Sequence, residues 1–264
     1  MKNINNLIRS QLFQLRHEQT IWRELLACLA FQIVTVLTFA LGMETQGIYD
    51  VQVTGCMFFA ENSTMIMLLP VSFLFLLAGQ ICAADFTDKT QNYEIMAGHT
   101  RSEIYCSRVI LSLILGILSG MLLVVVPVVA AGLYYGWGEQ MPVADAVNRI
   151  LLVAFPMIRM ICEAVFLAFI SRNPYLPAVV GGGMIMLSSL GMLDQCTPLI
   201  GISNINLLCR IEKYIVFDPQ EHILSTYDAS LAGTDIAGTV IFSLAGGILA
   251  LLLGNYFFRK DDIH

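Results

Sequence analysis

DFTDKTQNYEIMAGHTRSEIYCSR, residues 85–108, is a polar segment between two apolar runs, residues 63–84 and 109–135. Each apolar run is long enough for an α-helix to cross a bilayer, which takes about 20 residues. Residues 88–97 are predicted to form a short helix between the two spans. Gly98 is predicted to end that helix, because glycine adopts a left-handed backbone at little cost.

A second helix is predicted to start directly after this glycine. Thr100 and Glu103 match the T-x-x-E capping box, in which each residue satisfies a backbone N–H of the other. The result is two helices joined at a sharp corner beside the membrane. Such a corner indicates a contact surface for another protein, and an ordinary loop that connects two spans is the alternative.

The composition identifies the class of protein. Apolar residues make up 57% of the 264 residues, charged residues only 13%, and the mean hydropathy is +0.73. Soluble domains carry about 25% charged residues, so this chain lacks the polar surface that water on all sides requires. We therefore predict an all-α polytopic membrane protein, with residues 1–264 forming a single transmembrane domain.

About six membrane-spanning helices are predicted from the apolar runs. They cover residues 25–43, 63–84, 105–135, 147–170, 176–193 and 236–258. The third of these is longer than a bilayer requires, so it is expected to project beyond the membrane or to tilt.

The basic residues give the orientation of this arrangement. One side of the six-span arrangement carries Lys2, Arg9, Arg16, Arg23, Lys89, Arg101, Arg108, Arg172, Arg259 and Lys260. The opposite side carries only Arg149, Arg210 and Lys213. Because cytoplasmic loops are enriched in Lys and Arg, both termini and residues 85–108 are predicted to be cytoplasmic.

Residues 1–22 are predicted to form an amphipathic helix in the membrane interface, in contact with lipid. Its apolar side chains at helical spacing are Ile4, Leu7, Ile8, Leu12 and Leu15, and its basic ones are Lys2, Arg9 and Arg16. At the other side of the membrane, residues 194–235 form the longest connection. Its stretch LLCRIEKYIVF is expected to lie against the membrane. Cys196 and Cys209 both belong to this connection, where they either form a disulfide or remain free thiols.

Two features lie within the spans. Arg159 and Glu163 are four residues apart in the fourth span, so they share a helix face and can form an ion pair. This pair is either a substrate or gating contact or a structural bridge between helices. Ser112, Gly116 and Gly120 form a ridge of small residues that lets another helix approach closely. Packing within the chain explains such a ridge, and a seam between two chains, identical or different, is the alternative.

Several kinds of chemistry are absent from the sequence. It contains no G-x-x-x-x-G-K-[ST] phosphate loop, no H-E-x-x-H and no G-x-S-x-G motif. The seven cysteines and four histidines are scattered without the spacing of a metal site, and the net charge of −6 disfavours nucleic acid as a partner. The chain is therefore not expected to be an enzyme or to hold a metal or cofactor of its own.

Residues 85–108 and the six-span layout together resemble the membrane permeases of ABC exporters of the ABC-2 type. The likeness is greatest to the small bacterial permeases that confer immunity to lantibiotics and bacitracin. Their cytoplasmic segment after the second span carries an acidic residue, Gly or Lys before Thr, an Asn, and a Gly-x-[ST]-Arg corner. The matching residues are Asp85, Asp88, Lys89, Thr90, Asn92, Gly98, Thr100, Arg101, Glu103 and Tyr105. Lys89 stands where this family frequently has Gly.

The resemblance implies that residues 85–104 form a cytoplasmic coupling segment, whose short helix is a coupling helix that docks into a separate ATPase subunit. The docking residues implied are Asp88, Thr90, Asn92, Glu94, Gly98, Thr100, Arg101 and Glu103. ATP and Mg²⁺ would bind to that subunit, and residues 194–235 would form outer helices. Two permease chains, identical or different, and two ATPase chains would form the working unit in the bacterial cytoplasmic membrane.

The function expected from this resemblance is the outward transport of a peptide, a lipid-like molecule or another amphipathic substrate. A non-transporting membrane protein, such as a sensor, an assembly factor or an intramembrane enzyme, is the alternative. A secondary carrier is disfavoured, because no internal inverted repeat and no series of intramembrane carboxylates is present. Dependence on an ATPase partner distinguishes the first hypothesis from the second.

Overall fold

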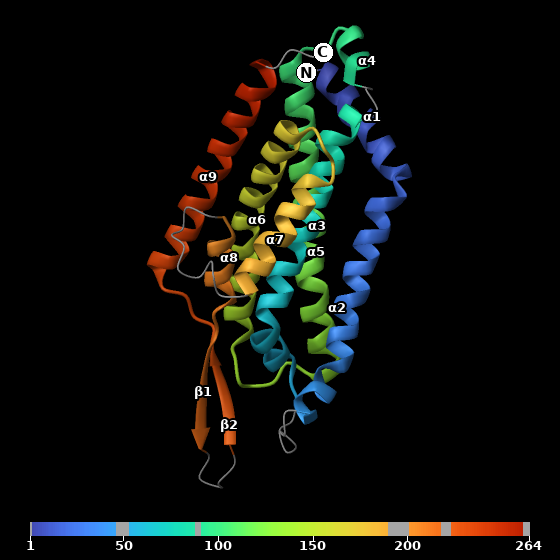
Figure 1. The fold of residues 1–264 in the computed structure, drawn as a ribbon. Coiled ribbons are helices and arrows are strands. Elements are labelled where there is room, and N and C mark those ends of the chain that lie inside the picture. The colour runs from blue at the N-terminus through green and yellow to red at the C-terminus, as the bar shows by residue number, and fades with distance from the viewer. Residues whose placement is uncertain (1, 46–52, 88–90, 190–200, 218–222, 261–264) are drawn as a thin grey trace.

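The computed structural model describes residues 2–45, 53–87, 91–189, 201–217 and 223–260. The elements in chain order are α1 (Lys2–His17), α2 (Gln19–Thr45), α3 (Gly55–Thr87), α4 (Gln91–Met96), α5 (Arg101–Tyr135), α6 (Val143–Ser171), α7 (Leu176–Ser189), α8 (Gly201–Cys209), β1 (Glu212–Phe217), β2 (Ile223–Asp228) and α9 (Gly233–Lys260). The helices form an elongated bundle, with the two strands projecting from one end (Figure 1).

Five helices are long and apolar enough to cross a membrane: α2, α3, α5, α6 and α9. This confirms the prediction of a largely helical, multi-pass membrane protein. The sixth apolar helix, α7, has 14 described residues, which span about 21 Å and fall short of a bilayer's hydrocarbon core of about 30 Å. The predicted fifth span, 176–193, extends past the described residues after Ser189.

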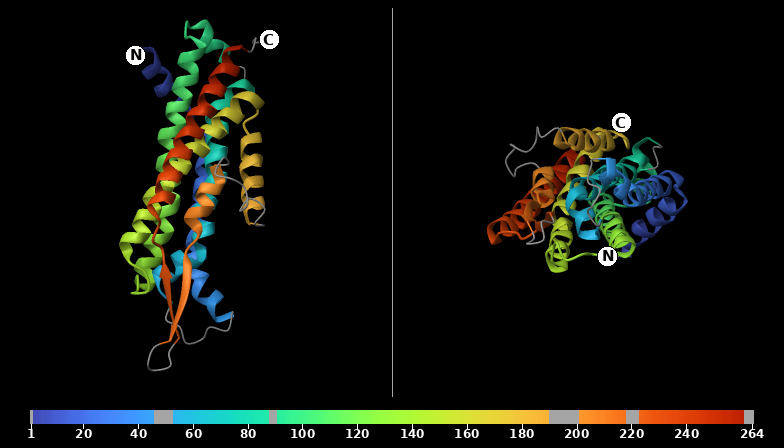
Figure 2. Two further views of the ribbon diagram at one scale, coloured as in Figure 1. Left: turned by 90° about the vertical axis from the view of Figure 1, so that its left-hand side faces the viewer. Right: turned by 90° about the horizontal axis from the view of Figure 1, so that it is seen from below.

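The two ends of the bundle differ. Helix α4, the beginning of α1 and the C-terminal end of α9 lie together at one end, here called the α4 end (Figure 1). The strands β1 and β2 lie at the opposite end, here called the hairpin end. Helix α3 is central, since 72% of its most apolar stretch is buried, against 11% for α2 and 22% for α9. Viewed along the bundle, the other helices surround α3 (Figure 2).

The small-residue ridge of α5 is covered by α3 and α6 of the same chain. A Cβ atom at Gly116 would lie 2.6 Å from Ile161 Cδ1, and one at Gly120 would lie 3.1 Å from Met157 Sδ. Ser112 is buried, with its hydroxyl 3.6 Å from Cys82 Sγ of α3. The ridge therefore serves packing within the chain, where the absence of side-chain bulk lets α5 and α6 approach closely.

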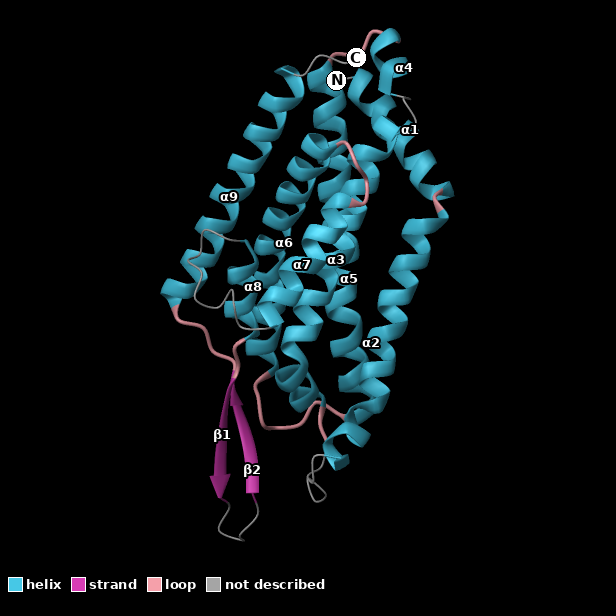
Figure 3. Ribbon diagram, viewed as in Figure 1, coloured by secondary structure: helices cyan, strands magenta, loops and turns pink. Residues whose placement is uncertain are grey.

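The hairpin end differs from what we expected for residues 194–235. Instead of one amphipathic stretch along the membrane, the described part consists of α8 followed by an antiparallel hairpin (Figure 3). The strands pair in register from Glu212 opposite Asp228 to Phe217 opposite Ile223. The sequences EKYIVF and ILSTYD are rich in β-branched and aromatic residues, which favour strands over helix. Among the described residues this hairpin is the departure from an all-α fold.

The N-terminal segment forms two helices with a break at Glu18, where α1 ends and α2 begins. One side of α1 is covered, with Leu7 4% exposed, and the other side is open, with Phe13 67% exposed. The amphipathic pattern therefore matches a helix with one buried face. Its position in the membrane interface stays a prediction.

Candidate functional site

The corner predicted after the second long span is present at the α4 end. Helix α4 is six residues long, and Gly98 follows it with a φ of +90°. The N–H of Gly98 donates to the carbonyl of Ile95 (3.0 Å), and the N–H of His99 donates to the carbonyl of Glu94 (3.2 Å). These two bonds form a Schellman motif, which closes the helix and reverses the chain at a glycine. Asp88 and Thr90 lie outside the described residues, and for Asn92 only the backbone is described, within α4.

The capping box at the start of α5 is also present. Glu103 N–H donates to the Thr100 hydroxyl oxygen at 3.3 Å, and Thr100 N–H donates to Glu103 Oε2 at 2.9 Å. Because the reciprocal bonds satisfy two backbone donors, α5 begins firmly at Arg101 rather than fraying. The corner between α4 and α5 is thus fixed on both sides, by Gly98 before it and by Thr100 after it.

A buried ion pair ties α4 to the bundle. Arg108 Nη2 lies 3.0 Å from Glu94 Oε2, and the Arg108 side chain is 0% exposed while that of Glu94 is 19% exposed. Arg108 Nη1 also donates to the backbone carbonyl of Cys82 in α3, at 3.1 Å. One guanidinium therefore connects α4, α5 and α3. Because a buried charge is costly without compensation, this contact holds α4 against the bundle.

The role of Arg108 was missed by sequence reasoning, which counted it only among the basic residues that give the orientation. Its position was a usable signal. Arg108 lies two turns inside a helix whose next residues are apolar, where a charge requires a partner. The nearest preceding acid, Glu103, is used in the capping box, and the next is Glu94, which the corner at Gly98 folds back toward α5.

The first turns of α5 are joined to the end of α9. Arg101 Nη1 donates to the carbonyl of Arg259 at 3.3 Å, and the Tyr105 hydroxyl donates to the carbonyl of Leu251 at 2.9 Å. Tyr105 can approach α9 this closely because Gly254 lies opposite, where a Cβ atom would be 2.6 Å from the hydroxyl oxygen. The start of α5 is therefore bound to α9 as well as to α4.

Four aromatic rings from four helices fill the space below the corner. They are Phe86 of α3, Tyr105 of α5, Phe169 of α6 and Phe258 of α9. The ring centroids of Tyr105 and Phe169 lie 4.8 Å apart, as do those of Phe169 and Phe258. Phe86 meets both phenylalanines edge-to-face, at 6.1 and 6.2 Å. Such packed rings stabilise one arrangement of the four helix ends.

The intramembrane pair Arg159–Glu163 lies elsewhere, at the contact between α6 and α9. Arg159 Nε is 2.7 Å from Glu163 Oε1, and Arg159 Nη1 donates to the carbonyl of Phe242 at 3.3 Å. The guanidinium lies over Gly246, where a Cβ atom would be 2.5 Å from Nε. The pair thus bridges two helices of one chain, which favours the structural interpretation, and the structure does not bring it to the α4 corner.

A second buried arginine organises the hairpin end. Arg149 of α6 is 2% exposed and donates hydrogen bonds to four backbone carbonyls, those of Leu208 (2.8 Å), Arg210 (2.7 Å), Ala229 (2.6 Å) and Ser230 (3.2 Å). These carbonyls belong to the end of α8 and to the segments on either side of the hairpin. Arg149, which sequence reasoning counted only among the basic residues that give the orientation, therefore binds the entry and exit of the hairpin to α6.

Further contacts hold the base of the hairpin against α3. Lys213 Nζ of β1 is 2.8 Å from Glu61 Oε1, and the Tyr227 hydroxyl of β2 donates to the same oxygen at 3.1 Å. Burial and the neighbouring Glu61 carboxylate raise the pKa of Tyr227 above its usual range, so the hydroxyl remains a hydrogen-bond donor. Cys209 lies nearby, with its thiol 3.6 Å from the Ser63 carbonyl, whereas Cys196 lies outside the described residues.

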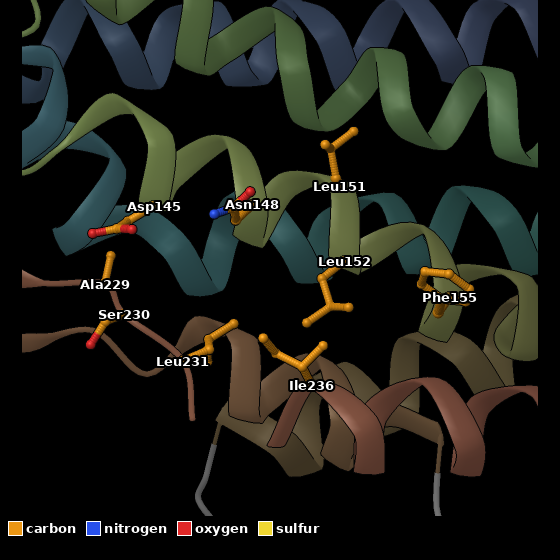
Figure 4. Close-up of a pocket in the computed structure, with 9 residues that line it drawn as sticks. All are labelled: Asp145, Asn148, Leu151, Leu152, Phe155, Ala229, Ser230, Leu231 and Ile236. Carbon is orange, nitrogen blue, oxygen red and sulfur yellow. The ribbon is translucent and has the colours of Figure 1, made fainter. Parts of the chain in front are cut away.

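A groove of about 460 Å³ opens beside this end, between α6 and the chain that leads from β2 into α9 (Figure 4). It is lined by Asp145, Asn148, Leu151, Leu152, Phe155, Ala229, Ser230, Leu231 and Ile236. Polar side chains lie toward one end and apolar side chains toward the other.

Comparison with known proteins leaves the family open, since no protein-family model and no curated protein matches this chain. Within the described ranges, no three His, Cys, Asp or Glu side chains lie together in a way that would hold a metal ion.

Proposed function

We propose that this chain is the membrane-spanning permease subunit of a bacterial ABC exporter of the ABC-2 type. It couples ATP hydrolysis by a separate ATPase subunit to the outward movement of a peptide, a lipid-like molecule or another amphipathic substrate. ATP and Mg²⁺ bind to the partner, and two permease chains assemble with two ATPase chains. The observation that carries this proposal is α4, a short helix displayed at one end of the bundle and fixed to the spans behind it.

The connections of α4 suit the transmission of a movement. The Gly98 corner and the Thr100–Glu103 box join α4 to α5 without a flexible linker. The Glu94–Arg108 pair joins it to α5 and, through the Cys82 carbonyl, to α3. A displacement of α4 by a partner is therefore passed to two long spans at once.

The lengths of these spans fit the same role. Helix α5 has 35 residues and α3 has 33, which correspond to about 52 and 50 Å. Both exceed a hydrocarbon core of about 30 Å, so they project beyond the membrane. With the α4 end in the cytoplasm, as the basic residues indicate, the projecting ends carry α4 toward a cytoplasmic partner.

The positions of the helix ends favour six membrane crossings. Helix α2 begins and α9 ends at the same end of the bundle, which requires an even number of crossings (Figure 1). The five long helices alone would give an odd number. Helix α7 descends from the α4 end and α8 leads to the hairpin end, so the two together supply the remaining crossing as a discontinuous span. Discontinuous spans are common in transport proteins.

The surface that α4 offers to a partner is small and partly apolar. Met96, its last residue, is 73% exposed, and Ala97 and Gly98 beside it are also exposed. Glu94, by contrast, faces Arg108 and is mostly covered. We expect Met96 and Arg101 to contact the ATPase, while Glu94 positions the helix from behind.

Association with an ATPase tests this function. The full chain is co-expressed with ABC ATPase subunits from the same genome, and co-purification and ATP hydrolysis are measured for wild type, Met96→Asp and Tyr214→Asp. Tyr214 is a matched control, because it is 49% exposed but lies at the hairpin end. We expect Met96→Asp to lower association about tenfold and Tyr214→Asp to leave it unchanged. A wild-type chain that associates with no ATPase would support the non-transporting membrane protein instead.

A further inference from the structure

The groove at the hairpin end has the character of an amphipathic ligand site. Its volume of about 460 Å³ lies within the range of about 300–1,000 Å³ that is usual for small-molecule pockets. Asp145 and Asn148 lie at one end of it, and Leu152, Ile236 and Phe155 follow along α6 and α9 (Figure 4). No residue of the α4 corner takes part, so the site is separate from the coupling surface.

The polar end carries a net negative charge. The Asp145 carboxylate forms no hydrogen bond or ion pair of its side chain with the described part of the chain, and the same holds for the Asn148 amide. Beside them, the hydroxyl and N–H of Ser230 donate to Asp228 and hold the pKa of that carboxyl below its usual range. Arg149, a cation that interacts electrostatically with both carboxylates, is buried and gives its hydrogens to four carbonyls. The negative charges of Asp145 and Asp228 thus outnumber the single positive charge of Arg149 with which they interact.

The apolar end is open to the surroundings of the bundle. Leu151 is 59% exposed and Ile236 is 40% exposed, and both belong to helices that are able to cross a membrane. From Asp145 to Phe155 the groove follows ten residues of α6, which corresponds to about 15 Å. That length is about half of a hydrocarbon core of 30 Å, the depth of one leaflet. An acyl chain can therefore enter this groove sideways from the bilayer.

We propose that the groove holds one membrane lipid whose headgroup carries an ammonium group, as phosphatidylethanolamine does. The ammonium lies against Asp145, Asn148 donates to the phosphate, and one acyl chain follows Leu152, Ile236 and Phe155. The lipid comes from the leaflet at the hairpin end. This inference does not depend on the exporter function, because it concerns the side of the bundle and its lipid surroundings.

Native mass spectrometry of the full chain tests the proposal. The purified protein is equilibrated with phosphatidylethanolamine or phosphatidylglycerol of identical acyl chains, and the bound fraction of each is measured. We expect wild type to retain phosphatidylethanolamine about fivefold better, the size of effect that a partly exposed ion pair gives. Asp145→Asn is expected to bring the two lipids within about twofold of each other.

Three further variants separate the groove from unspecific lipid contact. Asn148→Trp fills the polar end and is expected to lower retention of both lipids. Val147→Trp is its control, because Val147 is the preceding residue of α6 and is 45% exposed but does not line the groove. Glu139→Gln removes an exposed acid at the same end and should leave the preference unchanged. Equal retention of both lipids by wild type, a preference that survives Asp145→Asn, or retention that Asn148→Trp lowers no more than Val147→Trp would each overturn the proposal.

Discussion

The Glu94–Arg108 pair can be broken with a single substitution that preserves side-chain shape, Glu94→Gln. It leaves the Arg108 guanidinium, which is 0% exposed, with a neutral neighbour and the Cys82 carbonyl. Removing one partner of a fully buried pair costs about 3–5 kcal/mol. Because Glu94 is 19% exposed and glutamine still accepts one hydrogen bond, we expect a smaller cost of about 2–3 kcal/mol.

This cost falls on the docking of α4, since the pair holds the side of the helix against α5 and, through the Cys82 carbonyl, against α3. Each 1.4 kcal/mol changes an equilibrium tenfold, so the undocked population of α4 should rise about 30- to 140-fold. Hydrogen exchange measured by mass spectrometry reports such local opening. The informative amides are those of Gly98 and His99, which close the Schellman motif. Their exchange should accelerate by a similar factor.

Glu103→Gln is the matched control, because it makes the same chemical change in the capping box rather than in the buried pair. It should loosen the first turn of α5 and leave α4 protected. If Glu94→Gln leaves exchange at Gly98 and His99 unchanged, the ion pair does not hold α4 in place. If both variants release α4 equally, the corner rather than the pair fixes the helix.

Three other substitutions test separate parts of the structure. Gly98→Val should destabilise the corner by about 1–2 kcal/mol, because the φ of +90° at this position is strained for a β-branched residue. The expected result is a loss of coupling between ATP hydrolysis and transport, and Gly98→Asn should recover it, since asparagine tolerates that backbone region. Arg149→Met should leave four carbonyls without their donor and lower the free energy of unfolding by about 3–5 kcal/mol. The rate of proteolysis of the hairpin at low protease concentration should rise, and an unchanged cleavage rate would contradict the role of Arg149 in holding the hairpin to α6. Gly246→Val should lower the free energy of unfolding by about 1–3 kcal/mol, because the added side chain displaces Arg159. The control is Gly238→Val, where a Cβ atom meets nothing within 4 Å, and equal thermal stability of the two variants would refute this packing argument.

The features that the sequence predicted are those with local causes. The apolar runs predicted the long helices, Gly98 predicted the reversal, and Thr100 with Glu103 predicted the capping box. Each depends on residues within one or two helical turns. The predicted boundaries differ from the observed ones chiefly where the helices run past the apolar core, as α3 does by beginning at Gly55 rather than at Ser63.

The features that the sequence did not predict depend on tertiary contacts. Arg149 binds carbonyls 59 to 81 residues away, and no side-chain pattern marks a carbonyl as an acceptor. The pairing of Glu94 with Arg108 was not predicted, because the orientation of a six-residue helix is decided by the contacts behind it, and the docking role that the resemblance implies for Glu94 stays a prediction. The hairpin was not predicted, because EKYIVF was interpreted as part of an amphipathic stretch along the membrane, whereas it forms one of two paired strands.

Helices α6 and α9 are joined at three different depths. Near the hairpin end, Arg149 holds the segment that leads into α9; farther along, Arg159 binds the Phe242 carbonyl; and toward the α4 end, the rings of Phe169 and Phe258 pack 4.8 Å apart. Two helices that are in contact at three points along their length can neither change their crossing angle nor slide along one another without breaking one of these contacts. We therefore expect α6 and α9 to move as one rigid body. Any change in the shape of the bundle then takes place where this helix pair contacts the other helices.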